Sequence, residues 1–214
     1  MSHMKYALLA DGTSDEALSA IIDWALRERG IVADGEFFAA SRQPGRSRLV
    51  QRLRDVQQYG PYDLLFVHRD AENRDYKTRT REIEQAFAKA EESTAYVPVI
   101  PIRMTEAWLL FDEVLIRKAA GNPNGRMALS LPGPATLERL QNPKATLRTA
   151  LVTASSSKPR LRKLFDVNHA RQRVAELAQD FSPLRQLTAF QHFERDLAAA
   201  IDSFDAEERA SVSI

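Results

Sequence analysis

The chain has 214 residues, of which 44% are hydrophobic and 28% charged, and its formal net charge is +1; this composition supports a buried core and argues against global disorder. No apolar run approaches the roughly 18 residues needed to span a bilayer, and the amino terminus lacks an export signal, so we expect a cytoplasmic protein that does not enter a membrane. There is no cysteine, which excludes disulfides, thiolate zinc sites and cysteine nucleophiles.

Strand and helix patterns alternate over the first hundred residues. Short apolar runs predict strands at residues 5–10, 37–40, 63–68 and 96–102. Helical periodicity predicts helices at residues 13–29, 47–58 and 78–92, the first of them opened by a capping box of Thr13 and Glu16. This alternation predicts an α/β fold with a parallel sheet flanked by helices. Residues 1–3 resemble a cloning remnant and are excluded from the predicted fold.

The pattern changes after Pro101. Thr105 is expected to cap a helix that runs to about residue 119, and residues 129–134, rich in Pro and Gly, are expected to form a loop. Further helices are predicted at residues 135–140, 144–154, 168–179 and 183–201, and the polar tail beyond Ala206 is expected to fray. We therefore expect an α/β core at residues 4–125 and a helical carboxy-terminal portion at residues 126–206 packed on it.

Acidic residues follow two of the predicted strands. Asp11 and Asp15 lie in an Asp-Gly-Thr-Ser-Asp run after the first strand, and Asp70 and Glu72 follow the third. If these strands are neighbours in one parallel sheet, their carboxylates converge at its carboxyl edge, where ligand sites of such sheets gather. Carboxylates that close stay ionised only when a cation neutralises them. The pattern therefore predicts a magnesium site and chemistry on phosphates.

Each acidic cluster also has an ordinary structural explanation. Asp15 complements the dipole of the helix that it helps to open, and Asp70 and Glu72 fit a solvated turn. We interpret His68, next to this turn, as a structural group outside the site. A phosphatase of the haloacid-dehalogenase type is excluded, because Leu9 occupies the position at which that family carries its aspartate nucleophile.

The arrangement of acids resembles the Toprim domain of primases, topoisomerases and OLD-family nucleases. The run from Asp11 to Asp15 matches the acid-Gly-x-x-Asp spacing of the OLD type. The segment from Glu106 to Asp112, Glu-Ala-Trp-Leu-Leu-Phe-Asp, is similar to one found in small bacterial Toprim-like proteins. Two residues depart from the Toprim pattern: Asp11 replaces the usual Glu, and Glu72 replaces the usual Asp.

The resemblance implies a nuclease that uses Mg²⁺ or Mn²⁺ to cleave DNA or RNA. Asp11, Asp70 and Glu72 would be catalytic, and together with Asp15 and Glu106 they would hold two metal ions that clamp the scissile phosphate. Asp11 would also act as the general base. Such proteins work beside an ATPase in defence against phage, so the resemblance implies an ATPase as a possible partner.

Two basic segments are candidates for contact with nucleic acid, because clustered Lys and Arg neutralise phosphates. The candidate residues are Arg46 and Arg48 in the first segment, and Lys158, Arg160, Arg162 and Lys163 in the second. An ordinary solvated helix face carries similar charges.

Two other functions stay open at this point. The first is a non-catalytic subunit that binds nucleic acid or a protein through the same fold, which the departures at Asp11 and Glu72 favour. The second is hydrolysis or transfer on a small phosphorylated metabolite. Metal affinity that depends on the carboxylates would separate the enzymes from the binding subunit.

Overall fold

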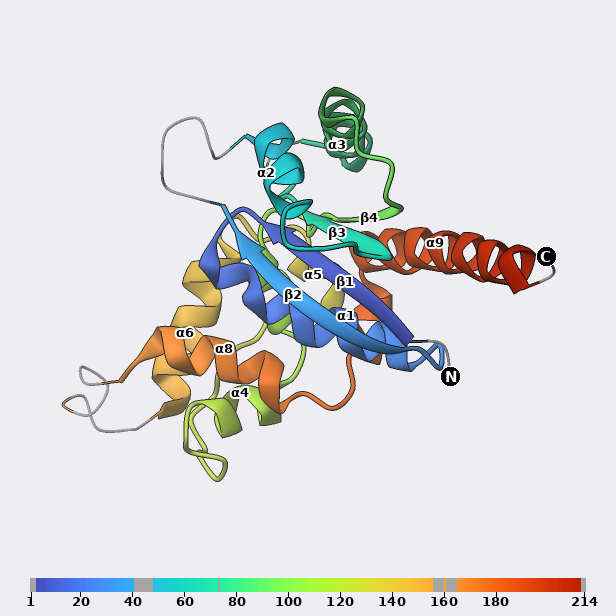
Figure 1. The fold of residues 1–214 in the computed structure, drawn as a ribbon. Helices are drawn as coiled ribbons and strands as arrows, with labels where there is room; N and C mark the ends of the chain where they lie inside the picture. Colours follow the sequence, from blue (N-terminus) through green and yellow to red (C-terminus); the bar gives the residue numbers. More distant parts are fainter. Residues whose placement is uncertain (1–2, 41–47, 73, 156–159, 161–164, 213–214) are drawn as a thin grey trace.

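The computed structural model describes residues 3–40, 48–72, 74–155, 160 and 165–212, and its centre is a four-stranded parallel sheet. The strands are β1 (His3–Ala10), β2 (Val32–Ala39), β3 (Leu64–His68) and β4 (Tyr96–Val99). Their order in the sheet is β2-β1-β3-β4, and all neighbours run parallel (Figure 1). The two strands that precede the acidic clusters, β1 and β3, are therefore neighbours, which is the condition for their acids to lie at the same edge of the sheet.

Helices cover both faces of the sheet. The 3-10 helix η1 (Thr13–Glu16) and α1 (Ala17–Arg27) connect β1 to β2, while α2 (Leu49–Val56) and α3 (Tyr76–Ala90) precede and follow β3. In Figure 1, α2 and α3 lie on one side of the sheet and α1 on the other. Side chains of β1 alternate between the two faces: Tyr6 and Leu8 join the core under α1, whereas Ala7 and Leu9 join the core under α2 and α3.

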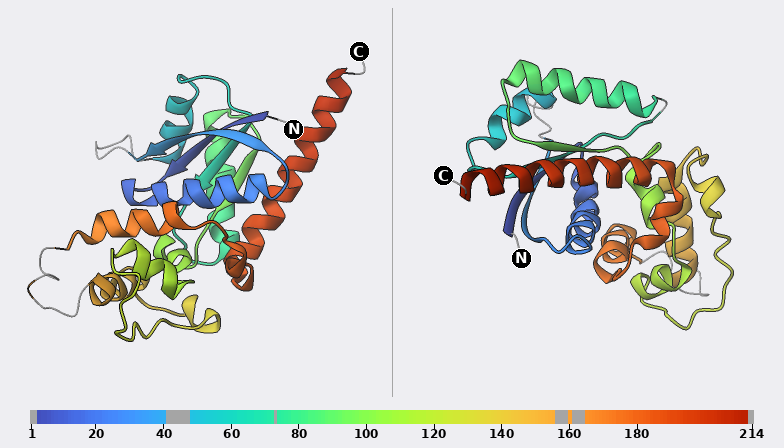
Figure 2. Two further views of the ribbon diagram at one scale, coloured as in Figure 1. Left: turned by 90° about the horizontal axis from the view of Figure 1, so that it is seen from below. Right: turned by 90° about the vertical axis from the view of Figure 1, so that its right-hand side faces the viewer.

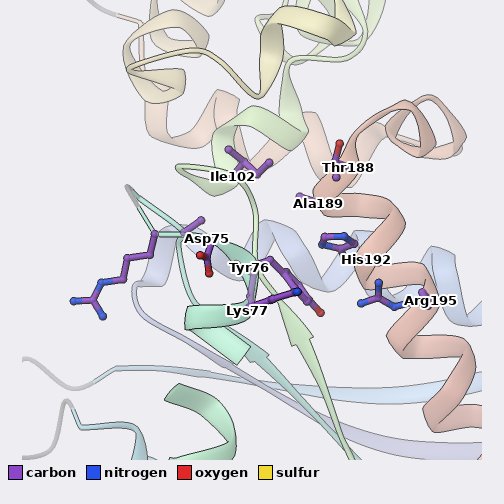
Figure 3. Close-up of a pocket in the computed structure, with 11 residues that line it drawn as sticks. Asp75, Tyr76, Lys77, Ile102, Thr188, Ala189, His192 and Arg195 are labelled. Atoms are coloured by element: carbon purple, nitrogen blue, oxygen red, sulfur yellow. The ribbon is translucent and has the colours of Figure 1, made fainter. Parts of the chain in front are cut away.

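The described part of the chain after β4 consists of helices and the loops between them. Its elements are η2 (Thr105–Leu109), α4 (Glu113–Ala119), α5 (Pro134–Leu137), α6 (Pro143–Ser155), α8 (Val167–Leu177), η3 (Ser182–Gln186) and α9 (Thr188–Val212). Most of them join the layer formed by α1, and α9 runs along β4 (Figure 2). A pocket lies between the first turns of α9 and the start of α3 (Figure 3).

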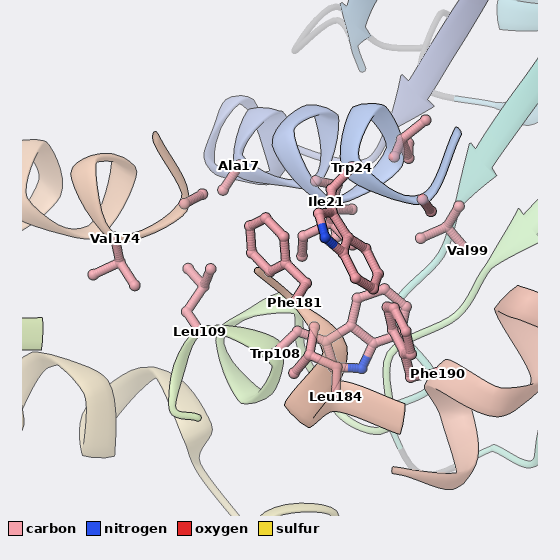
Figure 4. Packing of buried hydrophobic residues seen from close by; sticks show 14 of the residues in the cluster. Ala17, Ile21, Trp24, Val99, Trp108, Leu109, Val174, Phe181, Leu184 and Phe190 are labelled. Atoms are coloured by element: carbon pink, nitrogen blue, oxygen red, sulfur yellow. The ribbon is translucent and has the colours of Figure 1, made fainter. Parts of the chain in front are cut away.

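One large hydrophobic cluster joins the sheet to the carboxy-terminal helices. Trp24 of α1 packs edge-on against Phe181, with ring centroids 5.9 Å apart, and Trp108 of η2 packs against Phe190 at 5.3 Å (Figure 4). These rings are almost completely buried. The predicted α/β sheet flanked by helices, with helices in the carboxy-terminal part, is confirmed. None of the described helices is both long enough and apolar enough to cross a membrane.

Two local predictions about helix starts were wrong. The expected helix from Thr105 to residue 119 is interrupted at Leu110, because Asp112 accepts the N–H groups of Val114 (2.7 Å) and Leu115 (3.1 Å) and so starts α4 anew. Thr13 does not cap the first helix. Gly12 occupies that position, and its N–H donates to the Asp15 carboxylate at 2.9 Å.

The other differences concern element lengths. β2 begins at Val32 rather than residue 37, and His3, which the predicted fold excluded, pairs with Val32 at the start of β1. The helix expected at residues 183–201 is two elements, η3 and α9, separated by Leu187 in extended backbone. The tail expected to fray continues as helix to the end of α9.

Candidate functional site

Polar side chains gather at the carboxyl edge of the sheet, where β1 and β3 end. Asp11 follows β1 directly, and Asp70 follows β3 after one residue. Thr105, the first residue of η2, reaches the same place. The register pairs Leu9 with Val67, so the two strands end side by side.

His68, the last residue of β3, is the centre of this group. Its side chain is fully buried. Nε2 lies 3.2 Å from Asp70 Oδ1 and 3.1 Å from Thr105 Oγ1, and Nδ1 lies 3.5 Å from Asp15 Oδ2. Because the Thr105 hydroxyl donates to Asp15 Oδ1 at 2.9 Å, its contact with His68 requires Nε2 to be the donor. We refer to Asp11, Asp15, His68, Asp70 and Thr105 as the edge cluster.

The surroundings of His68 favour its charged form. Burial alone lowers the pKa of His68, but the hydrogen bond with Asp70 and the negative charges of Asp15, Asp70 and Asp11 outweigh it, so the pKa lies above its ordinary value. When it is protonated, the ring lies between Asp15 and Asp70 and balances part of their charge. Prediction from sequence left His68 outside the site, whereas the structure places it in the middle.

Asp15 is held in place by hydrogen bonds to both of its oxygens. Oδ2 accepts the Gly12 N–H and Oδ1 accepts the Thr105 hydroxyl, and the residue is 7% exposed. The backbone turn in which Asp15 N–H donates to Gly12 C=O at 3.2 Å fixes this geometry. Asp15 therefore positions Thr105 and His68 and offers little free surface to a ligand.

Asp11 is more open and faces two arginines. Arg52 Nη1 lies 3.2 Å from Asp11 Oδ1, and Arg69 Nε lies 3.3 Å from Asp11 Oδ2. Arg52 comes from α2, is itself buried, and also donates to the Ala10 carbonyl at 2.7 Å. Burial lowers the pKa of Arg52 and Asp11 opposes that shift, and a guanidinium remains charged at neutral pH in any case.

The remaining two predicted ligands lie with other arginines. Glu72, in left-handed backbone with φ 55°, has a side chain that is 68% exposed, and its Oε2 lies 3.1 Å from Arg79 Nη2. Glu106 is buried, and its Oε1 lies 3.0 Å from Arg171 Nη1 of α8. The structure thus brings Asp11, Asp15 and Asp70 together, while Glu72 and Glu106 form separate ion pairs.

Two carboxylates of the edge cluster, those of Asp11 and Asp70, are accessible to solvent. Among the residues that the structure describes, no group of three or more His, Asp or Glu side chains is arranged to hold a metal ion. The side chains of Asp11 and Asp70 are 39% and 31% exposed. Mg²⁺ is commonly bound through one or two carboxylates together with waters and substrate phosphates, so a metal ion at this edge would need most of its ligands from water or a substrate.

The predicted nucleic-acid contacts lie mostly outside the described part of the chain. Arg48, just before α2, and Arg160 are both exposed. Arg46, Lys158, Arg162 and Lys163 lie outside the described residues.

Sequence reasoning missed the cations of the site as well as His68. Arg52 shares the buried face of α2 with Leu49, Leu53 and Val56, and an arginine on an otherwise apolar helix face was a readable signal for a buried acidic partner. No such feature of the sequence around Arg69 indicated an acidic partner for that arginine.

Comparison with protein families, with curated proteins and with solved structures found no match for this chain.

Proposed function

We propose that this chain is a hydrolase of phosphodiesters that depends on Mg²⁺ or Mn²⁺, acting as a nuclease on DNA or RNA. The observation that carries the proposal is the convergence of Asp11 and Asp70 at the ends of neighbouring strands, with both carboxylates still partly exposed. The carboxyl edge of a parallel sheet is where such folds place their ligands. The Toprim resemblance of the acidic runs supports the same reaction.

The residues of the edge cluster would divide the work. Asp11 and Asp70 would hold the metal ion, which supplies polarisation of a phosphate oxygen and activation of a water. His68, being fully buried, would not touch the substrate; it orients Asp70 through the 3.2 Å contact, and Asp15 fixes His68 in turn. Arg69, which is 26% exposed beside Asp11, would contact a phosphate oxygen, for which a guanidinium is well suited.

The test compares Asp70→Asn with Glu84→Gln. Asparagine keeps the shape of Asp70 but lacks the charge that a hard cation needs, and metal-based stabilisation is worth several kcal/mol, so cleavage of labelled DNA or RNA should slow about a hundredfold or more. Mn²⁺ binding measured by calorimetry should weaken in parallel. Glu84 is an exposed acid of α3 whose charge acts on Tyr96, at the amino end of β4, so its variant should keep both properties.

The proposal fails if Asp70→Asn cleaves as fast as the unaltered chain while its metal affinity also stays the same. Thermal unfolding of each variant provides the control for folding. Loss of cleavage in a variant that still melts cooperatively is then a loss of the site and not of the fold.

A specific observation favours a second candidate, a non-catalytic subunit that binds nucleic acid or a protein. Every predicted acidic ligand already lies near a cation of the protein: Asp11 near two arginines, Asp15 and Asp70 near His68, and the two glutamates near one arginine each. In that case the acids are part of an internal ion-pair network that needs no metal. Calorimetry separates the candidates, because the subunit would show no Mn²⁺ affinity that depends on Asp70.

A further inference from the structure

A separate pocket of about 550 Å³ lies between α3 and α9 (Figure 3). Its apolar wall includes Ile100 and Ile102, which follow β4, and Ala189 of α9. Ala71, the neighbour of Asp70 in sequence, also lines it, but no residue of the edge cluster does. Its size falls within the range of small-molecule pockets, about 300–1,000 Å³.

Two aromatic rings form one side of the pocket. Tyr76, the first residue of α3, lies against His192 of α9 with ring centroids 4.3 Å apart. The Tyr76 hydroxyl donates to Asp196 of α9, and both rings are only half-buried. The hydrogen bond holds the Tyr76 ring in place before any ligand arrives, which lowers the entropic cost of stacking a planar group there.

Positive side chains surround the same pocket. Arg74, Lys77 and Arg195 line it, against one carboxylate, Asp75. Asp75 is engaged as the cap of α3, accepting the Thr78 N–H at 2.7 Å. The charge at the mouth of the pocket therefore favours an anion.

Lys77 is the cation best placed to bind that anion. Arg74 forms an ion pair with Glu82, and Arg195 forms one with Asp196 at 2.8 Å. Lys77 is exposed and lines the pocket, and the carboxylate on which its charge acts, Asp75, already accepts a hydrogen bond as the cap of α3. The backbone N–H of Ala189, at the start of α9, is not available to bind the anion, because it already donates to Glu138 at 2.8 Å.

We propose that this pocket binds a nucleotide, with the base against Tyr76, His192 and the apolar wall, and the phosphate at Lys77. The nucleotide is either a free nucleoside monophosphate or one unit of a polynucleotide strand, which share this chemistry. This binding needs no metal ion and no residue of the edge cluster, so it can be tested independently of the proposed hydrolysis.

The experiment titrates the full chain with AMP in the presence of EDTA and follows the heat of binding. We expect one saturable site with a dissociation constant below about 1 mM. Adenosine and ribose 5-phosphate should each bind at least about tenfold more weakly, because each lacks one of the two groups that the pocket contacts. A short oligonucleotide that displaces AMP would identify a strand as the source of the nucleotide, and one that does not would identify the free nucleotide.

Two variants and two controls locate the site. Lys77→Gln should weaken AMP binding about tenfold without affecting adenosine binding. Thr188 lines the pocket at an exposed position, so Thr188→Trp should block the binding of AMP and of adenosine. Lys89→Gln alters another exposed lysine of α3 that does not line the pocket and should change nothing, and Asp70→Asn should bind AMP normally. Equal weakening by the two lysine variants, equal affinity for AMP and adenosine, or no saturable binding of AMP would each overturn the proposal.

Discussion

Replacing His68 by glutamine tests the charge balance of the edge cluster. The substitution keeps a polar side chain of similar reach but removes the cation that lies between Asp15, whose side chain is 9% exposed, and Asp70, at 31%. Removing one partner of a buried ion pair costs about 3–5 kcal/mol; because Asp70 is partly solvated, we expect the lower end, about 3 kcal/mol. For a chain of this size that corresponds to a fall in melting temperature of roughly 6–12 °C.

The cost of His68→Gln should also depend on pH. Because the folded state raises the pKa of His68, its contribution to stability is complete below the ordinary histidine value of about 6.5 and is lost as pH rises through the raised pKa. The difference in unfolding free energy between the unaltered chain and the variant should therefore be larger at pH 6 than at pH 9.

Urea denaturation of both proteins across this range, without metal, measures that difference. His169→Gln, an exposed histidine of α8, is the matched control and should change stability by less than about 0.5 kcal/mol. A His68→Gln cost that is the same at both ends of the pH range would refute the imidazolium between the two carboxylates. A cost near zero would refute the coupling of His68 to them altogether.

Two further predictions concern packing and burial. Gly35→Ala places a Cβ 2.2 Å from Tyr6 Cζ, so it should lower the free energy of unfolding by about 1–3 kcal/mol, measured by urea denaturation. The control, Gly133→Ala, has no neighbour within 4 Å of its Cβ and should lower it little. Similar values for the two variants would contradict the close approach of β2 to the Tyr6 ring. Arg171→Met leaves Glu106 buried without its cation and should cost about 3 kcal/mol, most of which should return when Glu106→Gln is added. Strictly additive effects in that double-mutant cycle would argue against the ion pair.

The alternation of strands and helices was readable because each strand of the predicted core is a short apolar run. β1 and β3 are buried along most of their length, so their hydrophobicity is continuous in the sequence. β2 was harder to predict, since it lies at the edge of the described sheet beside β1 and its first half contains Asp34 and Gly35. The helix predicted through residues 110–112 failed because a local cap, Asp112, competed with the helical pattern around it.

The sequence by itself determined where Asp11 and Asp70 lie: parallel strands end at a common edge, so a residue just after a buried strand is placed there by local pattern. Only the tertiary structure decided what those acids face. The partner of Glu106 is 65 residues away, the hydroxyl that binds Asp15 is 90 away, and the pocket wall is closed by a hydrogen bond between residues 120 apart. Charge pairing and cavities depend on distances in space, and segments this far apart in sequence acquire those distances only when the core packs.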